Sequence, residues 1–350
     1  MADIRATFKN SLRPAEEEIQ LILRSVNKAY EKILSRVPSN RVSTVKNVLQ
    51  IIVGARRPLT TEEMAMALGI AESPQSETVA EAGLDSSRMG GVIRRLCGLF
   101  VFINHSKVYL LHQTAKDFLM RKNNACNIEH LFLWTLTDVE HQLALICLRC
   151  LLMKNLVNDD LYHIPGFLKY AAIYWQDHVR EMGVTQDPKA IQRLQQVYTM
   201  SPRRLSLLFT SMSTINDPCE SLNIPALTLA SRNGHIQAVE FLLSATGTDV
   251  NAKDEWENRS IFWASKEGYD EVVQLLLERG ADVNAQGGNA QLNRAAIESN
   301  KQPASMSKVY PPDMPCKRPL VKDMIKSRKL AQSVLEVDFM QALPDPSSNR

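Results

Sequence analysis

The 350-residue sequence predicts a mainly α-helical protein whose later part is built from a repeated unit. Apolar residues recur at spacings of three and four over most of the chain, as on the buried face of an amphipathic helix. Asn-Gly-His-x3-Val-x2-Leu-Leu at residues 233–243 is followed by Glu-Gly-Tyr-x3-Val-x2-Leu-Leu at residues 267–277. Each copy ends in Asp-Val-Asn-Ala, at residues 249–252 and 282–285.

A period of about 33 residues with two helical patterns in each period is the signature of ankyrin repeats. We therefore predict a short ankyrin solenoid over residues 220–300, with two full repeats and a partial third whose first helix would lie at residues 291–300. Ankyrin stacks bind other macromolecules, so a protein-binding module is the first functional hypothesis.

The amino-terminal part combines helices with a single hairpin. Helical patterns cover residues 15–34, 45–53, 86–98 and 114–120, with a polar loop expected at residues 71–83. Thr60 and Glu63 form a capping box that begins another short helix. Two β-rich runs, at residues 99–103 and 107–111, flank a turn and predict a hairpin. Helices that end in a two-stranded wing describe a winged-helix domain, which we place at residues 26–122.

The remaining segments differ in periodicity. Helical patterns continue over residues 131–182 and become weaker toward residue 223, which predicts a helical spacer at residues 123–219. We expect residues 1–25 to be the remnant of a helical amino terminus. Prolines interrupt the pattern beyond the repeats, so residues 301–350 are expected to be a disordered tail.

Composition excludes several classes of protein. The net charge of +3 is too small to argue for nucleic acid or an acidic membrane as the partner. Six scattered cysteines indicate reduced thiols rather than a disulfide framework. The first ten residues lack the apolar run of a signal peptide, and the longest apolar stretch, residues 143–153, is about half a membrane span. A cytoplasmic protein is expected, with the nucleus as the alternative.

Several motifs occur in a fixed order along the chain. Ala-Tyr-Glu-Lys-Ile-Leu-Ser-Arg at residues 29–36 precedes Arg-Pro-Leu-Thr at residues 57–60 and Arg-Leu-Cys-Gly-Leu-Phe at residues 95–100. Val-Tyr-Leu-Leu-His-Gln-Thr-Ala-Lys-Asp-Phe-Leu follows at residues 108–119. Together they resemble the winged-helix region after the NACHT module of fungal NACHT–ankyrin proteins, which are NLR-like members of the STAND class of signal-transducing ATPases. Phe-Leu-Lys-Tyr-Ala-Ala at residues 167–172 resembles the spacer of that family, and the resemblance extends over residues 26–284.

The chain also departs from that family. It contains no Gly-x4-Gly-Lys-Ser/Thr loop to hold ATP phosphates, so the resemblance does not extend to ATPase activity, and no cofactor is expected. Two explanations stay open: an upstream module belongs to a longer gene product, or this is a shortened relative that lost its motor. A misjudged gene structure near Gly287 would also explain the short repeat array.

The ankyrin consensus Asp-x-x-Gly-x-Thr-Pro-Leu-His-x-Ala-Ala-x-x-Gly-His contains variable positions that face the partner. Trp256 is the best candidate anchor there, since an exposed tryptophan suits a binding hot spot, whereas the alternative is that it packs on the neighbouring repeat. Glu257 replaces the turn glycine and Phe262 replaces the histidine, so a looser turn is expected. Two repeats bury little surface and should pack on the preceding helices. The predicted partner-binding residues are Ser221, Leu222, Ile224, Arg232, Asn233, Glu255, Trp256, Asn258, Lys266 and Glu267.

Other candidate sites have simpler explanations. Arg88, Arg94, Arg95 and Lys107 could face nucleic-acid phosphates, but a solvated face is favoured, and the resemblance implies a packing and autoinhibitory role for a winged helix. Cys147 and Cys150 have no second ligand pair at zinc spacing, so buried structural thiols are expected and no metal site. His112 is interpreted as a strand-to-helix junction residue without a nucleophile or carboxylate partner.

We therefore interpret the chain as a non-enzymatic protein that binds a protein partner through its ankyrin groove in intracellular regulation or signalling. Neither a small-molecule substrate, a membrane nor nucleic acid is expected as its partner, and the sequence makes no prediction about the oligomeric state. The alternative is a nuclear transcriptional co-regulator, for which the basic residues at 317–318 and 326–329 are a weak indication.

Overall fold

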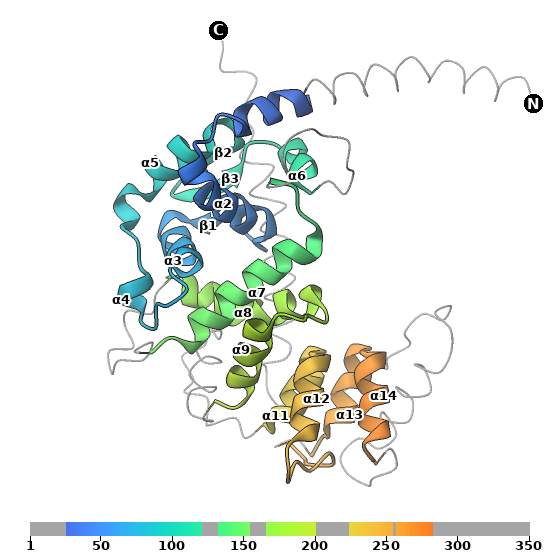
Figure 1. Ribbon diagram of the computed structural model, residues 1–350. Helices are drawn as coiled ribbons and strands as arrows, with labels where there is room; N and C mark the ends of the chain where they lie inside the picture. Colours follow the sequence, from blue (N-terminus) through green and yellow to red (C-terminus); the bar gives the residue numbers. More distant parts are fainter. Residues whose placement is uncertain (1–25, 121–131, 155–165, 201–223, 255–256, 283–350) are drawn as a thin grey trace, which may run out of the picture.

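The computed structural model describes residues 26–120, 132–154, 166–200, 224–254 and 257–282. These residues form a mainly helical molecule, as predicted, with three short strands. Figure 1 shows the order of the parts along it: the winged-helix elements at one end, helices α7, α8 and α9 in the middle, and two helix pairs at the other end. The predicted segments 1–25, 291–300 and 301–350 lie outside the described residues.

The first part is a winged-helix domain. Its strands form an antiparallel sheet in the order β1-β3-β2, in which Leu59 pairs with Val108. The predicted hairpin is confirmed, and β1 adds a third strand that the sequence reasoning missed, because two residues are too few for an alternating pattern. Its elements are α2 (Val42–Gly54), β1 (Leu59–Thr60), α3 (Thr61–Glu72), α4 (Val79–Ala82), α5 (Ser86–Cys97), β2 (Val101–Asn104) and β3 (Lys107–Leu110).

Local chemistry explains where these elements begin and turn. The capping box is confirmed, since the Glu63 amide donates to Thr60 Oγ1 at 3.1 Å and the Thr60 amide donates to the Glu63 carboxylate at 2.9 Å. His105 and Ser106 have φ values of 47° and 60°, as the tight hairpin turn between β2 and β3 requires. Residues 71–83 are not entirely a loop, because they contain α4, whose single turn is too short to produce a helical period.

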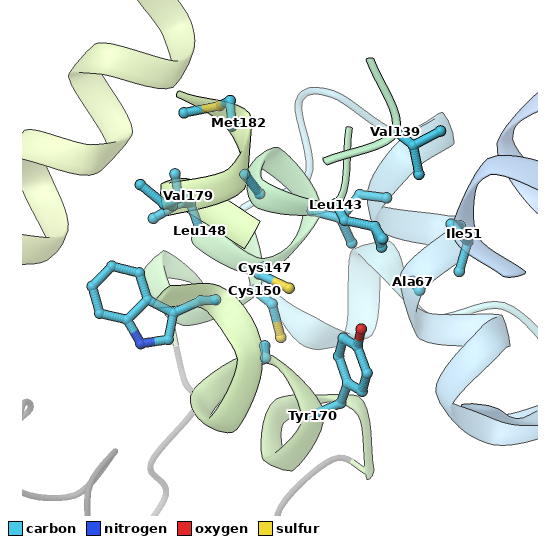
Figure 2. Packing of buried hydrophobic residues seen from close by; sticks show 14 of the residues in the cluster. Ile51, Ala67, Val139, Leu143, Cys147, Leu148, Cys150, Tyr170, Val179 and Met182 are labelled. Atoms are coloured by element: carbon cyan, nitrogen blue, oxygen red, sulfur yellow. The ribbon is translucent and has the colours of Figure 1, made fainter. Parts of the chain in front are cut away.

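The spacer helices build a core that continues into the winged helix. Helices α7 (Leu136–Leu152) and α8 (Gly166–Met182) pack on each other most extensively, and α7 also packs on α2. Figure 2 shows Cys147 and Cys150 of α7 inside this core, near Tyr170 of α8. Both thiols are buried, as predicted, and burial raises the pKa of Cys150 to about 12. Helix α9 (Pro188–Tyr198) also belongs to the spacer, whereas α6 (Gln113–Leu119) follows β3 in the winged-helix domain.

A buried polar relay fixes the spacer to the winged helix. Arg56, between α2 and β1, donates to both carboxylate oxygens of Glu140 on α7, at 2.7 and 2.9 Å. His178 on α8 lies 2.6 Å from Glu140 through Nδ1 and 2.9 Å from the Tyr170 hydroxyl through Nε2. The Tyr170 hydroxyl also accepts the Arg56 amide, so it donates its own proton to Nε2. No residue of this relay was expected from the sequence to have a special role.

Ionisation within the relay follows from burial and pairing. Burial opposes the charge of Glu140, but hydrogen bonds from His178 and Arg56 hold its pKa below the usual value. Burial outweighs the neighbouring carboxylate at His178, so the pKa of His178 is lowered and the ring is neutral. A neutral ring that donates from Nδ1 to Glu140 satisfies every member of the relay.

The two full repeats form two helix pairs: α11 (Ala226–Asn233) with α12 (Ile236–Ser244), and α13 (Ser260–Glu267) with α14 (Asp270–Glu278). The first helix of each pair ends at a glycine in the left-handed region, Gly234 at φ 72° and Gly268 at φ 78°. Helices α11 and α13 pack side by side, as successive repeats of a solenoid do. Among the described helices, none has the length and apolar character that crossing a membrane requires.

Candidate partner-binding face

The variable ends of α11 and α13 bring together charged and aromatic side chains from the two repeats. Arg232 ends α11, whereas Trp263, Lys266 and Glu267 lie on α13. We call these four residues the recognition face. Lys266 and Glu267 occupy the two variable positions before the glycine of the second repeat, and Arg232 occupies the corresponding position of the first.

The structure describes six of the ten residues that the sequence suggests for partner binding. Asn233 and Asn258 are buried, with 7% and 8% of their surface exposed, and both form hydrogen bonds within the protein. Ile224, Arg232 and Lys266 are half-buried, and Glu267 is exposed. The other four, Ser221, Leu222, Glu255 and Trp256, lie outside the described residues. A binding role for all ten stays a prediction.

Trp263 is the buried base on which the charged side chains of the recognition face lie, and sequence reasoning overlooked it. The Arg232 guanidinium carbon lies 4.8 Å from the centroid of the Trp263 ring, and Lys266 Nζ lies 4.9 Å from it. The indole is only 5% exposed. Trp263 occupies the variable position between the consensus histidine and the alanine pair, so the consensus itself could have identified it.

Asp254 joins the indole to the turn that precedes α13. One carboxylate oxygen accepts the Trp263 Nε1 proton at 2.7 Å, and the other accepts the Asn258 amide at 2.9 Å. Phe262, at the consensus histidine position, is buried against the Trp263 ring. Glu257 adopts a φ of 63° where the consensus has glycine. The carboxylate of Asp254 therefore links the turn to the indole of α13.

The end of α11 and the turn that follows it are hydrogen-bonded to the spacer through the side chains of Asn233 and His235. The side-chain amide of Asn233 donates through Nδ2 to the Tyr198 hydroxyl at 3.1 Å, and that hydroxyl lies 2.6 Å from His235 Nδ1. His235 Nε2 donates to the Gln176 carbonyl at 2.9 Å, so Nδ1 is the acceptor of the Tyr198 proton. The two repeats thus pack on α8 and α9, as their small size predicts.

Further contacts define the same junction. Arg180 of α8 donates to the Tyr269 hydroxyl at 3.1 Å, and Gln237 exchanges two hydrogen bonds with the backbone of Thr185. An open cavity of about 570 Å³ lies beside these residues, between the end of α8 and the starts of α12 and α14. Since Arg180, Gln237 and Tyr269 are already hydrogen-bonded, their role there is to orient the repeats.

The burial of His235 predicts a pH dependence of stability. Burial lowers the pKa of His235 to about 4, below the value of roughly 6.5 that the unfolded chain should show. The unfolded state therefore binds the proton first, and the stabilisation present above pH 6.5 is lost as the pH falls toward 4. We expect a loss of about 3 kcal/mol in the free energy of unfolding from this residue.

The measurement is denaturant unfolding of the protein and of the His235→Gln variant between pH 7 and pH 4. The difference between the two proteins in the free energy of unfolding should shrink over this range, because only the original protein loses the contribution of His235. Groups that the two proteins share titrate in both and cancel in the difference. A difference that stays constant with pH would contradict the assignment.

Residues considered for other functions make local contacts. The Arg88 side chain is 84% exposed and pairs with Asp85 at 3.4 Å, and Arg94 donates to the Ile103 carbonyl at 3.4 Å. His112 begins α6 and accepts the Thr114 amide through Nδ1, as a junction residue should. In the part of the chain that the structure describes, no group of three or more His, Cys, Asp or Glu residues could hold a metal ion.

Comparison with known protein families agrees with this architecture. Residues 202–287 match the family model described as ankyrin repeats (3 copies). Residues 33–129 match the model described as the winged helix domain of GPI inositol-deacylase.

Individual relatives cover different parts of the chain. The vegetative incompatibility protein HET-E-1 of Podospora anserina is 27% identical over 202 residues, which cover 51% of this chain and 14% of HET-E-1. The palmitoyltransferase akr1 of Schizosaccharomyces pombe is 41% identical over 66 residues, or 19% of this chain and 10% of akr1, within the ankyrin repeats. The ankyrin repeat-containing protein YIL001W of Saccharomyces cerevisiae is 42% identical over 59 residues, or 17% of this chain and 11% of that protein. The chain thus spans about a seventh or less of the length of each of these relatives.

Proposed function

We propose that this chain is a non-enzymatic binding protein of intracellular regulation. It joins a winged-helix domain of the GPI inositol-deacylase type to ankyrin repeats. Over half its length it is also homologous to the fungal NACHT–ankyrin protein HET-E-1. The partner of this chain is another protein, which it holds on the recognition face of the ankyrin repeats.

The observation that carries this proposal is the arrangement around Trp263. Arg232 and Lys266 come from successive repeats and lie against one indole, so the face spans two repeats as ankyrin binding surfaces do. Arginine is among the residue types most enriched at binding hot spots, and Arg232 is half-buried on this face. The buried indole is held by the Asp254 hydrogen bond, so the ring on which Arg232 and Lys266 lie is already ordered before a partner binds.

The other two parts serve as a platform for the repeats in this proposal. Glu140 joins the spacer to the winged helix through its ion pair with Arg56, and Tyr198 joins the spacer to the repeats through His235. Glu140, Tyr198 and His235 are buried, so these contacts fix the direction in which the recognition face points. This function uses the winged helix for packing and does not require it to contact nucleic acid.

Charge reversal on and off the recognition face tests the proposal. Partners are recovered by affinity purification with the full chain from cells that express it, and the Arg232→Glu/Lys266→Glu variant is compared with it. The matched control is Lys189→Glu/Arg279→Glu, which makes the same charge change at exposed positions of α9 and the end of α14. We expect the face variant to lose a partner that the control retains. Equal recovery of every partner by the two variants would refute the proposal.

A further inference from the structure

Arg232 is a half-buried cation that forms no hydrogen bond with any residue that the structure describes. With the residues that the structure describes, its guanidinium stacks on Trp263 but forms no hydrogen bond or ion pair. Burial lowers the pKa of Arg232, and the neighbouring Glu267 and Asp254 carboxylates partly offset this effect. The protein thus places a partly desolvated cation at the recognition face without giving it a bonded carboxylate.

Among the described residues, Asp254 and Glu267 are the acidic groups that act on Arg232, and neither forms an ion pair with it. Both carboxylate oxygens of Asp254 are occupied, one by the Trp263 indole and the other by the Asn258 amide. Glu267 is exposed, and it lies close enough to attract Arg232 but forms no ion pair with it. The indole below the guanidinium holds the guanidinium plane in place, which leaves the N–H groups along its edge to receive a ligand.

Resting on the proposed function, we infer that the partner presents an acidic peptide segment, one carboxylate of which binds the edge of the Arg232 guanidinium. A guanidinium fork matches a carboxylate through two parallel hydrogen bonds, and stacking on an aromatic ring orders the fork beforehand. Lys266, on the same indole, adds positive charge beside the bound carboxylate. Glu267 repels the same carboxylate, so Lys266 should strengthen the binding of an acidic peptide and Glu267 should weaken it.

Selection from a random peptide library displayed on phage tests this inference with the full chain as bait. We expect the recovered peptides to be enriched in glutamate and aspartate. The dissociation constants of synthetic copies should rise roughly 10- to 100-fold with Arg232→Ala, because a charge-assisted hydrogen bond is lost. Arg232→Lys should give a smaller rise, since it keeps the charge without the fork. Glu267→Gln should tighten binding by roughly 2- to 5-fold, because a surface repulsion is removed.

The outcomes separate this inference from the proposed function. Peptides that depend on Arg232 and Lys266 but are apolar or basic would overturn the acidic segment and leave the recognition face intact as a binding surface. Peptides that bind the Arg232→Glu/Lys266→Glu variant as tightly as the original protein would overturn both. Glu267 is exposed, so its variant folds normally, and weaker binding of acidic peptides by Glu267→Gln would also overturn the inference.

Discussion

Replacing Glu140 by alanine is expected to lower the free energy of unfolding by about 3–5 kcal/mol, because it leaves charged and polar groups of a buried relay without their partner. Glu140 is 1% exposed and accepts both hydrogen bonds of the Arg56 guanidinium as well as that of His178. Without the carboxylate, His178 loses the acceptor of its Nδ1 proton inside the core. The effect should appear in denaturant unfolding followed by far-ultraviolet circular dichroism at neutral pH.

The control for this prediction is an exposed glutamate on a packed helix of the same part. Glu181 lies on α8 and is exposed, so Glu181→Ala should change the free energy of unfolding by no more than about 0.5 kcal/mol. Glu140→Gln keeps the shape and some hydrogen bonds, so its loss should be smaller than that of Glu140→Ala. If Glu140→Ala unfolds at the same denaturant concentration as Glu181→Ala, the relay does not stabilise the junction of winged helix and spacer.

Replacing Trp263 by alanine is expected to destabilise the ankyrin repeats by about 3–5 kcal/mol. The substitution removes a buried indole, leaves a cavity between α11 and α13, and releases the Asp254 carboxylate that closes the turn. A two-repeat segment has few other contacts to compensate, since each repeat depends on its neighbours. Hydrogen exchange should show that the substitution accelerates amide exchange in α13 and α14 relative to the original protein, with a smaller change in α7.

Trp263→Phe separates packing from hydrogen bonding at this position. It keeps an aromatic ring beside Arg232 but removes the indole donor, which leaves one oxygen of Asp254 without that bond. The expected loss in the free energy of unfolding is about 1–3 kcal/mol, which is smaller than the loss expected for Trp263→Ala. Unchanged exchange in α13 for both variants would mean that the indole does not hold the turn.

Local patterns were reliable wherever the structure depends on near neighbours in the chain. The Thr60–Glu63 capping box, the turn at His105 and Ser106, and the helix ends at Gly234 and Gly268 all arise within a few residues. The elements that the patterns missed, β1 and α4, are too short to show a period. The winged helix and the ankyrin repeats were recognisable because their motifs lie in a fixed order along the chain.

The candidate binding residues were harder to predict, because burial depends on contacts between distant segments. Asn233 and Asn258 occupy variable positions of the repeat, yet the structure buries both, and Asn233 bonds to Tyr198 of the spacer. Trp263 occupies an equally variable position and is buried as well, and it forms the base of the face because Arg232 of the previous repeat lies on its ring. A repeat consensus states which positions vary but not which of them a neighbouring domain covers.

The sequence by itself determined the helical class, the repeat period and the order of the parts, since these follow from the spacing of apolar residues and from turn chemistry within each segment. Only the tertiary structure decided how the parts are joined. Glu140 meets Arg56 across 84 residues of chain, and His235 meets Tyr198 across 37. Buried polar groups must find partners when the segments pack, and those partners depend on the geometry of packing rather than on sequence spacing.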